Sequence, residues 1–207
     1  MKIRSVMGGL AAATLLCAGP ALAAVEAGQV SRKLQPNEEG AQAGLDVRVG
    51  FGGLMGDVGK ETGVGPLLGI TAVVQPYELL GFEAGYEGQR LPIDDVRVAN
   101  GEGIWRHNVG LLAKVGPLVQ EHWRPFAGVG AGLSYFNPSS GAEPLFDNDI
   151  VEEVPLVAGV DYHFGSLSAG ARASYRLMFG ESFANDALAG GPGGNLLNAT
   201  LTLGGRF

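Results

Sequence analysis

The chain has 207 residues, the size of one domain, and carries 14 basic and 21 acidic residues for a net charge of −7. Such an acidic chain makes nucleic acid a poor partner, because phosphate binding depends on Lys and Arg. Glycine accounts for 35 residues, more than twice its average share of about 7%, but no G-x-y period occurs, so collagen is excluded. The hydrophobic content of 46% excludes a wholly disordered chain.

Residues 1–23 have the pattern of a secretory signal peptide. Lys2 and Arg4 give it a basic start, an apolar run follows, and Ala21-Leu22-Ala23 forms a small-x-small cleavage site. An N-terminal membrane anchor is the alternative, but Pro20 and the short apolar run favour the signal peptide. The sequence therefore predicts export.

The remainder of the chain loses its only cysteine with this leader. Without Lys2 and Arg4 it carries 12 basic against 21 acidic residues, a net charge of −9, and Cys17 is also removed. Disulfides, cysteine-ligated metals and a cysteine nucleophile are then excluded. Residues 24–43 are polar, lack a strong period and are predicted to form a periplasmic tail.

From residue 44 the hydrophobic period becomes two, which is typical of β-strands. In the clearest example, Val109, Leu111 and Ala113 alternate with Gly110 and Leu112. Eight such segments have the length that crosses a bilayer when tilted, and an even number of strands closes a barrel without a free edge. The predicted strands are Leu45–Phe51, Leu68–Val74, Leu80–Glu87, Trp105–Val115, Ala127–Tyr135, Leu156–Phe164, Leu167–Leu177 and Leu197–Phe207.

The predicted connections alternate in length. Short links follow every second strand, and long links separate the others, as in outer-membrane barrels with their long loops outside the cell. The short links are Gln75–Leu79, Gly116–His122 and Gly165–Ser166, and the long links are Gly56–Gly65, Gln89–Gly103, Asn137–Glu153 and Gly180–Asn195.

Two barrel types fit this alternation. A secreted lipocalin-like barrel binds a lipid inside an apolar lumen, whereas a membrane barrel turns its apolar face to lipid. The second face here is rich in Gly and Ser with a few charges, which suits a narrow closed lumen better than a solvated exterior. Aromatic residues near the strand ends also suit membrane interfaces: Tyr86, Trp105, Tyr135, Phe164, Phe179 and Phe207. The sequence predicts an all-β, eight-stranded, antiparallel up-and-down transmembrane barrel over residues 44–207.

Three segments resemble the small OmpA/OmpX-like outer-membrane barrels of Gram-negative bacteria: Pro125–Phe136, Val160–Phe164 and the closing strand. The terminal Phe207, preceded by apolar residues at alternate positions, resembles the signal read by the barrel assembly machinery, although Gly205 departs from it. The resemblance implies an outer-membrane location, contact with membrane lipids and lipopolysaccharide, and a structural or surface-interaction role through the loops.

The candidate site residues are the charges on the inward face, predicted to form a salt-bridge network that plugs the lumen. Glu83 and Glu87 are expected near Arg106 and Lys114, because the two strands are neighbours. Asp161 is likewise expected to neighbour two arginines on the next strand, Arg172 and Arg176. Two further inward charges, Asp46 and Arg48, complete the set. A gated narrow ion path is the functional alternative, but eight strands leave an interior just filled by side chains.

No cofactor or resident metal is expected, and an enzyme is the less favoured alternative. A lipid A-modifying hydrolase would need a His beside a Ser and an acid, and only His163, with Ser168 or Ser174, has a suitable position. His107 is predicted to face lipid and His122 to lie in a turn. The acidic stretch at 147–153 would suit divalent cations or, more simply, a solvated loop.

Overall fold

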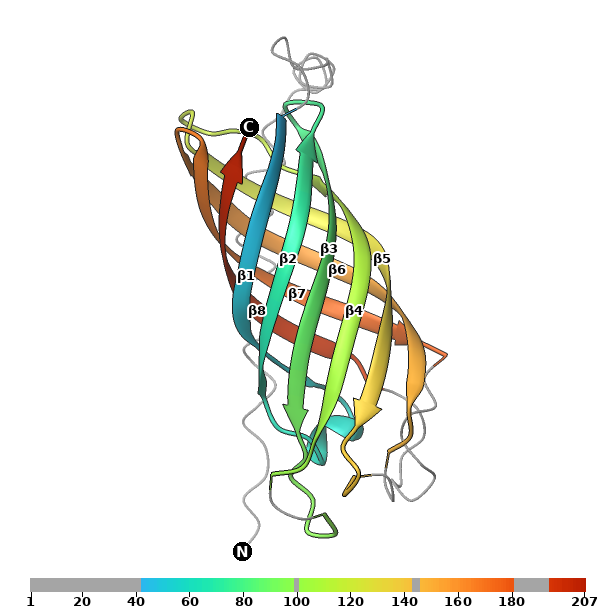
Figure 1. Cartoon of the computed structure of the whole chain (residues 1–207). Helices are drawn as coiled ribbons and strands as arrows, with labels where there is room; N and C mark the ends of the chain where they lie inside the picture. Colours follow the sequence, from blue (N-terminus) through green and yellow to red (C-terminus); the bar gives the residue numbers. More distant parts are fainter. Residues whose placement is uncertain (1–41, 99–100, 143–145, 181–193) are drawn as a thin grey trace, which may run out of the picture. The chain divides into compact units, whose positions relative to one another are not determined.

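The computed structural model describes residues 42–98, 101–142, 146–180 and 194–207. They form one antiparallel sheet in which each strand pairs with the next and β8 pairs with β1 to close a barrel (Figure 1). The predicted fold class is confirmed. In the part of the chain described, no helix is long and apolar enough to span a membrane. The strands are β1 (Gln42–Leu54), β2 (Gly65–Gln75), β3 (Leu80–Pro92), β4 (Gly103–Val115), β5 (Trp123–Pro138), β6 (Asp149–Phe164), β7 (Leu167–Phe179) and β8 (Leu196–Arg206).

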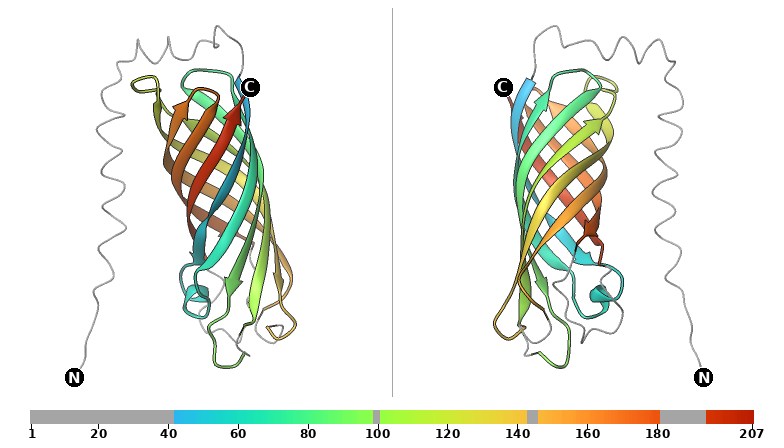
Figure 2. Two further views of the ribbon diagram at one scale, coloured as in Figure 1. Left: turned by 60° about the vertical axis from the view of Figure 1, so that its left-hand side comes forward. Right: turned by 90° about the vertical axis from the view of Figure 1, so that its right-hand side faces the viewer.

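The connections divide the barrel into a turn end and a loop end (Figure 2). The turn end carries the three short links, and the tightest joins β6 to β7 through Gly165 and Ser166. Gly165 has a φ of 65°, a left-handed conformation that glycine adopts without steric cost. The loop end carries the four longer links, the first of which contains the short helix η1 (Val58–Lys60). The predicted alternation of short and long connections is therefore present.

Several strands extend further than the sequence predicts. β3 continues to Pro92 and β6 begins at Asp149, so parts of the predicted links Gln89–Gly103 and Asn137–Glu153 are strand. The reason is that the inward face changes from small and charged side chains to apolar side chains near the loop end. Near the loop end, Leu91 and Val151 point inward and are fully buried. β1 also begins at Gln42, two residues before the predicted barrel start, and the predicted leader and the tail up to residue 41 lie outside the described residues.

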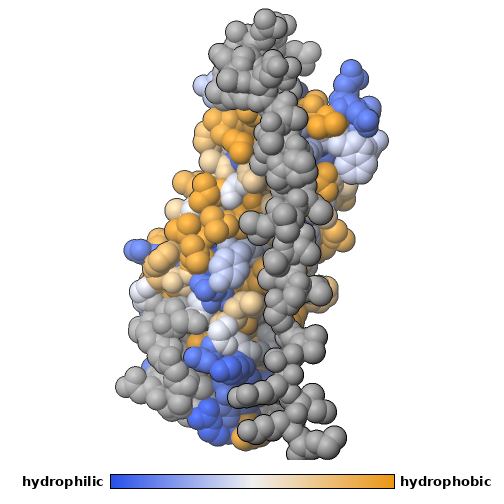
Figure 3. Space-filling view, turned by 180° about the vertical axis from the view of Figure 1, so that it is seen from behind, coloured by the Kyte–Doolittle hydropathy of each residue, from blue (hydrophilic) through white to orange (hydrophobic). Residues whose placement is uncertain are grey.

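Apolar side chains predominate on the outer face of the barrel between its ends, as on the side drawn in Figure 3. Leu111 and Val109 on β4 are 66% and 63% exposed, whereas Asn108 and Leu112, at alternate positions of the same strand, are buried. The predicted girdle aromatics Tyr86, Trp105, Tyr135, Phe164, Phe179 and Phe207 are all exposed. A wide exposed apolar band is unstable in water and is the surface that acyl chains solvate.

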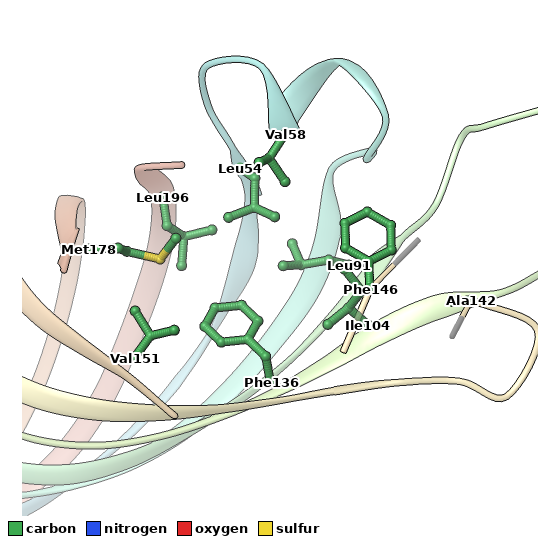
Figure 4. Close-up of a cluster of buried hydrophobic side chains, with 10 residues drawn as sticks. All are labelled: Leu54, Val58, Leu91, Ile104, Phe136, Ala142, Phe146, Val151, Met178 and Leu196. Carbon is green, nitrogen blue, oxygen red and sulfur yellow. The ribbon is translucent and has the colours of Figure 1, made fainter. Parts of the chain in front are cut away.

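An apolar cluster closes the lumen at the loop end (Figure 4). Most of its members are inward-facing residues from the strand ends, and Val58, Ala142 and Phe146 reach it from the long links. The sequence predicts only polar side chains in the lumen, and this cluster corrects that prediction. We call it the apolar cap: Leu54, Val58, Leu91, Ile104, Phe136, Ala142, Phe146, Val151, Met178 and Leu196.

The β5–β6 ladder contains a gap in its pairing. Pairing runs from Trp123–Tyr162 to Val129–Leu156 and resumes in the same register at Gly132–Glu153. The positions between them, Gly130–Ala131 and Val154–Pro155, are not paired. Proline has no N–H to donate, which explains the gap. We call it the β5–β6 seam, and no other ladder among the described residues has an internal gap.

Candidate functional site

The inward charges converge in the lumen. Because side chains alternate along each strand, charges spaced by even numbers point to the same axis. Each of the seven predicted site residues is at most 6% exposed: Glu83, Glu87, Arg106, Lys114, Asp161, Arg172 and Arg176. Asp46 and Arg48, also predicted to face inward, form ion pairs there as well. The charges form two clusters along the barrel axis.

The loop-side ion cluster consists of two glutamates and two arginines that alternate. Arg106 donates to Glu87 (2.8 Å) and, through two nitrogens, to both carboxylate oxygens of Glu153 (2.8 and 2.6 Å). Arg176 completes the ring, with donors 3.0 Å from Glu87 and 3.0 Å from Glu153. Each carboxylate therefore contacts both guanidinium groups, which offsets the cost of burying four charges.

Polar neutral side chains satisfy the remaining groups of this cluster. Ser134 donates to Glu153 at 2.5 Å, and Asn198 donates to Glu87 at 3.3 Å. Asn108 contacts Glu153 from β4, also at 3.3 Å. These contacts come from β4, β5 and β8, so the cluster and its polar neighbours join six strands, β3 to β8.

The turn-side ion cluster is centred on Glu83. Its carboxylate accepts from Arg48 (2.6 Å) and Arg172 (2.8 Å) and lies 2.8 Å from the Lys114 ammonium group. Lys114 also donates to Asp161 at 3.1 Å. One carboxylate thus balances three cations, and a second carboxylate shares one of them.

An aromatic ring packs between the cations of this cluster. The Phe126 ring centroid is 4.9 Å from the Lys114 nitrogen and 5.1 Å from the guanidinium carbon of Arg172, which are cation–π distances. Nearer the turn end, Arg206 donates to Asp46 at 2.5 Å. Side chains therefore fill the lumen from the turn end to the apolar cap.

The structure corrects some of the predicted neighbours. Asp161 is 4.0 Å from Arg172, at the limit of an ion pair, and Arg176 contacts Glu87 and Glu153 instead of Asp161. The reason is that long side chains reach across a narrow lumen, so partners lie on opposite walls as well as on adjacent strands. The predicted pairs Glu87–Arg106 and Glu83–Lys114 do form.

Glu153 is a site residue that the sequence pattern did not identify. It was expected in an acidic loop, but it lies in β6, is 1% exposed and joins the loop-side ion cluster. The alternation of β6 carries the signal, because Glu153 is in phase with Asp161 on the inward face. Glu152 also lies in β6 and points outward, so these two carboxylates diverge and do not share one loop site. No group of three or more metal-binding side chains occurs among the described residues.

The structure also places the remaining candidate residues, His163, His107 and Phe207. His163 is partly buried and its Nε2 has no partner among the described residues; Ser168 lies opposite it in the ladder, and no hydrogen bond joins the two side chains. His107 faces outward, with Nδ1 2.6 Å from the Tyr86 hydroxyl. Phe207 is 86% exposed and exchanges backbone hydrogen bonds with Ala43.

The comparisons with known proteins identify the fold. No protein family and no curated sequence matches the chain. Among solved structures, Neisserial surface protein A is similar with a TM-score of 0.60 and 14% identity, over 81% of this chain and 99% of that chain. Ail from Yersinia pestis, crystallised with a heparin analogue, has a TM-score of 0.49 and 13% identity over 81% and 99% of the two chains. The outer membrane enzyme PagL has a TM-score of 0.43 and 14% identity, over 77% of this chain and 97% of that chain.

Structural similarity at such low sequence identity establishes only the fold. The function has to be argued from the site, since one fold carries many functions. The match to Neisserial surface protein A covers nearly all of that barrel. The resemblance inferred from the sequence is confirmed at this level: the chain has the fold of the small eight-stranded outer-membrane β-barrels.

Proposed function

We propose that the chain is an integral outer-membrane protein in which a closed barrel anchors a surface-contacting loop end. The observation that carries this proposal is the distribution of polarity across the barrel wall. Leu111 is 66% exposed on the outer face, whereas Arg106 on the same strand is fully buried in the lumen. A lipocalin-like barrel needs the opposite arrangement, with an apolar lumen and a polar exterior.

The contents of the lumen support a structural role. The two ion clusters fill the middle of the barrel, and the apolar cap closes its loop end. An open axial pore would need both to move, and breaking buried ion pairs is costly. The barrel therefore serves as a scaffold, and contacts with partners are made by the loops.

Backbone hydrogen bonds order the surface of the described part of the loop end. The first two long links are joined by a bridge between Thr62 and Ile93, and Gly63 donates to the Pro92 carbonyl at 2.8 Å. Ser139 N donates to the Gly103 carbonyl at 2.9 Å, which ties the third link to β4. These bonds give a partner a surface that is partly ordered in advance.

This surface is acidic. Its described carboxylates outnumber its cations, which favours a partner that carries positive charge, or divalent cations bridging to lipopolysaccharide phosphates. The exposed or partly exposed carboxylates are those of Asp57, Glu61, Asp94, Glu102, Asp147, Asp149 and Glu152, and the cations are Lys60, Arg90 and Arg97. Export by a leader at residues 1–23 and recognition of Phe207 by the barrel assembly machinery complete the proposal.

Fractionation and surface labelling test it together. An epitope inserted beside Val96, which is fully exposed in the second long link, is expected to be stained on intact cells, with the protein extracted from membranes only by detergent. Recovery in the soluble periplasmic fraction would overturn the proposal in favour of a lipid-binding barrel. A membrane-bound protein whose epitope is stained only after permeabilisation would overturn the assigned orientation.

A further inference from the structure

Three aromatic rings lie close together on the outer face of β3 and β4, which are neighbours in the barrel wall (Figure 1). The His107 ring is nearly parallel to the rings of Tyr86 and Trp105, with interplanar angles of 25° and 16° and centroid distances of 6.2 and 6.4 Å. Both flanking rings are exposed, and we call the three residues the loop-end aromatic patch. Exposed aromatic rings of membrane barrels gather at the level of the lipid headgroups.

The hydrogen bond within this patch leaves a free donor on His107. Its Nδ1 is 2.6 Å from the hydroxyl of Tyr86. When the hydroxyl donates to Nδ1, the ring proton of the neutral imidazole is on Nε2. His107 makes no other side-chain hydrogen bond among the described residues. The Nε2 N–H group is therefore available to an acceptor on the outer face of the barrel.

The strand surface beside His107 carries no side chain. The ladder pairs Gly88 on β3 with His107 on β4, and Arg90 with Trp105. A Cβ at Gly88 would contact only the Tyr86 ring, at 3.4 Å or more. Gly88 thus leaves an open position between the side chains of Tyr86 and Arg90, next to the His107 ring.

Arg90 is an outward cation that no described carboxylate neutralises. Its neighbours on β3, Gln89 and Leu91, are 1% and 0% exposed and face the lumen, so Arg90 lies on the outer face. One of its guanidinium nitrogens donates to the Gly101 carbonyl at 2.5 Å, and no ion pair joins Arg90 to a carboxylate among the described residues. A guanidinium group with unused donors is well suited to bind phosphate.

A second aromatic patch at the turn end lacks such a cation. There the Tyr162 ring contacts the rings of His122 and Trp123, with centroid distances of 5.6 and 4.7 Å. The adjacent Arg124 is only 8% exposed and donates to a backbone carbonyl of the β2–β3 turn at 2.8 Å. In the part of the chain described, the loop-end aromatic patch is thus the one that combines exposed rings with an unpaired outward arginine.

We infer that the loop-end aromatic patch, together with Gly88 and Arg90, binds the phosphorylated sugar headgroup of a glycolipid such as lipid A. The phosphate accepts hydrogen bonds from Arg90 and from Nε2 of His107, and the C–H face of the sugar packs on the Trp105 ring. The rings favour a sugar over a glycerol phosphodiester, because glycerol has no flat apolar face to place on them. This inference rests on the proposed outer-membrane location and goes beyond it by assigning a lipid site to the barrel wall.

Lipid A binding by the full chain tests this site. Diphosphorylated lipid A is titrated into the protein refolded in dodecyl maltoside micelles, and bound lipid is counted by native mass spectrometry. Dephosphorylated lipid A and phosphatidylglycerol are the comparison lipids. Arg90→Gln removes the cation, and Gly88→Leu fills the open position with an apolar side chain. The matched controls are Ala84→Leu, at another small outward position of β3, and Trp123→Leu in the turn-end patch.

We expect one saturably bound lipid A, with at least tenfold lower affinity for either comparison lipid. Arg90→Gln and Gly88→Leu should each lower the affinity for lipid A at least tenfold, whereas both controls should keep it. Folding of every variant is checked by its heat-modifiable migration on a gel. Equal binding of the three lipids, full affinity in Arg90→Gln, or an equal loss in the controls would overturn the inference. A folded, membrane-extracted protein without saturable lipid A binding contradicts this site alone, whereas recovery in the soluble periplasmic fraction contradicts the proposed function.

Discussion

Removing the charge of Glu83 should destabilise the barrel more than any change at an exposed ion pair. The carboxylate of Glu83 is 2.6–2.8 Å from nitrogens of Arg48, Lys114 and Arg172, and its side chain is 1% exposed. Glu83→Gln keeps the size of the side chain but leaves three buried cations with Asp161 as their remaining nearby carboxylate.

The magnitude follows from the cost of an unpaired buried charge. Removing one partner of a buried ion pair typically costs about 3–5 kcal/mol, and here one removal affects three cations. We therefore expect a loss near the upper part of that range, about 4–5 kcal/mol. With an m-value of about 2 kcal/mol/M in urea, the unfolding midpoint should fall by about 2 M.

The assay is reversible urea unfolding of the refolded protein in lipid vesicles, followed by tryptophan fluorescence. Asp57→Asn removes a carboxylate from the exposed Lys60 pair and should leave the midpoint unchanged. Adding Arg48→Gln to Glu83→Gln should recover part of the loss, because one unpaired cation is removed. An unchanged midpoint for Glu83→Gln would refute the claim that the lumen is held by paired charges.

Three further perturbations test other parts of the barrel. Phe136→Ala, at a fully buried position of the apolar cap, should lower the free energy of unfolding by about 3–5 kcal/mol in the same assay, and a loss below 1 kcal/mol would mean that the cap is not packed. Leu111→Arg should cost about 2–4 kcal/mol if this position lies near the bilayer midplane, measured as the folding equilibrium in vesicles. Gly204→Ala should lower the urea midpoint, because its Cβ would lie 1.8 Å from Asp46 Oδ1, whereas Gly205→Ala, whose Cβ would meet only one atom at 3.9 Å, should not.

The architecture of the barrel could be predicted because a membrane environment imposes a simple alternation of apolar and confined residues. In a lipid-facing barrel the outer residues must be apolar and the inner residues are confined, so a period of two appears directly in the sequence. Leu111 and Arg106 lie on the faces that their sequence positions indicate. Strand count and the alternation of connection lengths follow from the same pattern.

The period-two pattern no longer identifies the strands where they extend past the apolar band. Near the loop end, Leu91 and Val151 are inside and Glu152 is outside, so the phase of hydrophobicity is inverted and the segments look like loops. Glu153 was misplaced for this reason, although its alternation with Asp161 places it inward. An alternation count continued through Pro155 would have found it.

Partner choice inside the lumen could not be predicted from strand order. Arg176 binds carboxylates from β3 and β6, and Glu83 binds cations from β1, β4 and β7. Such contacts depend on the tilt of the strands and on the width of the lumen, which set the residues that meet across the axis. Sequence alternation gives the face of a residue but not its height relative to the opposite wall.

The orientation of the barrel wall is tested most directly by the collision rates of a spin label at Leu111 in lipid vesicles. A nitroxide at this position should collide more with oxygen, which concentrates in acyl chains, than with a water-soluble nickel complex. A label at Val96 in the second long link should show the reverse order. If the nickel complex relaxes the label at Leu111 more strongly than oxygen does, the outer face of this barrel lies in water and the proposed membrane location is wrong.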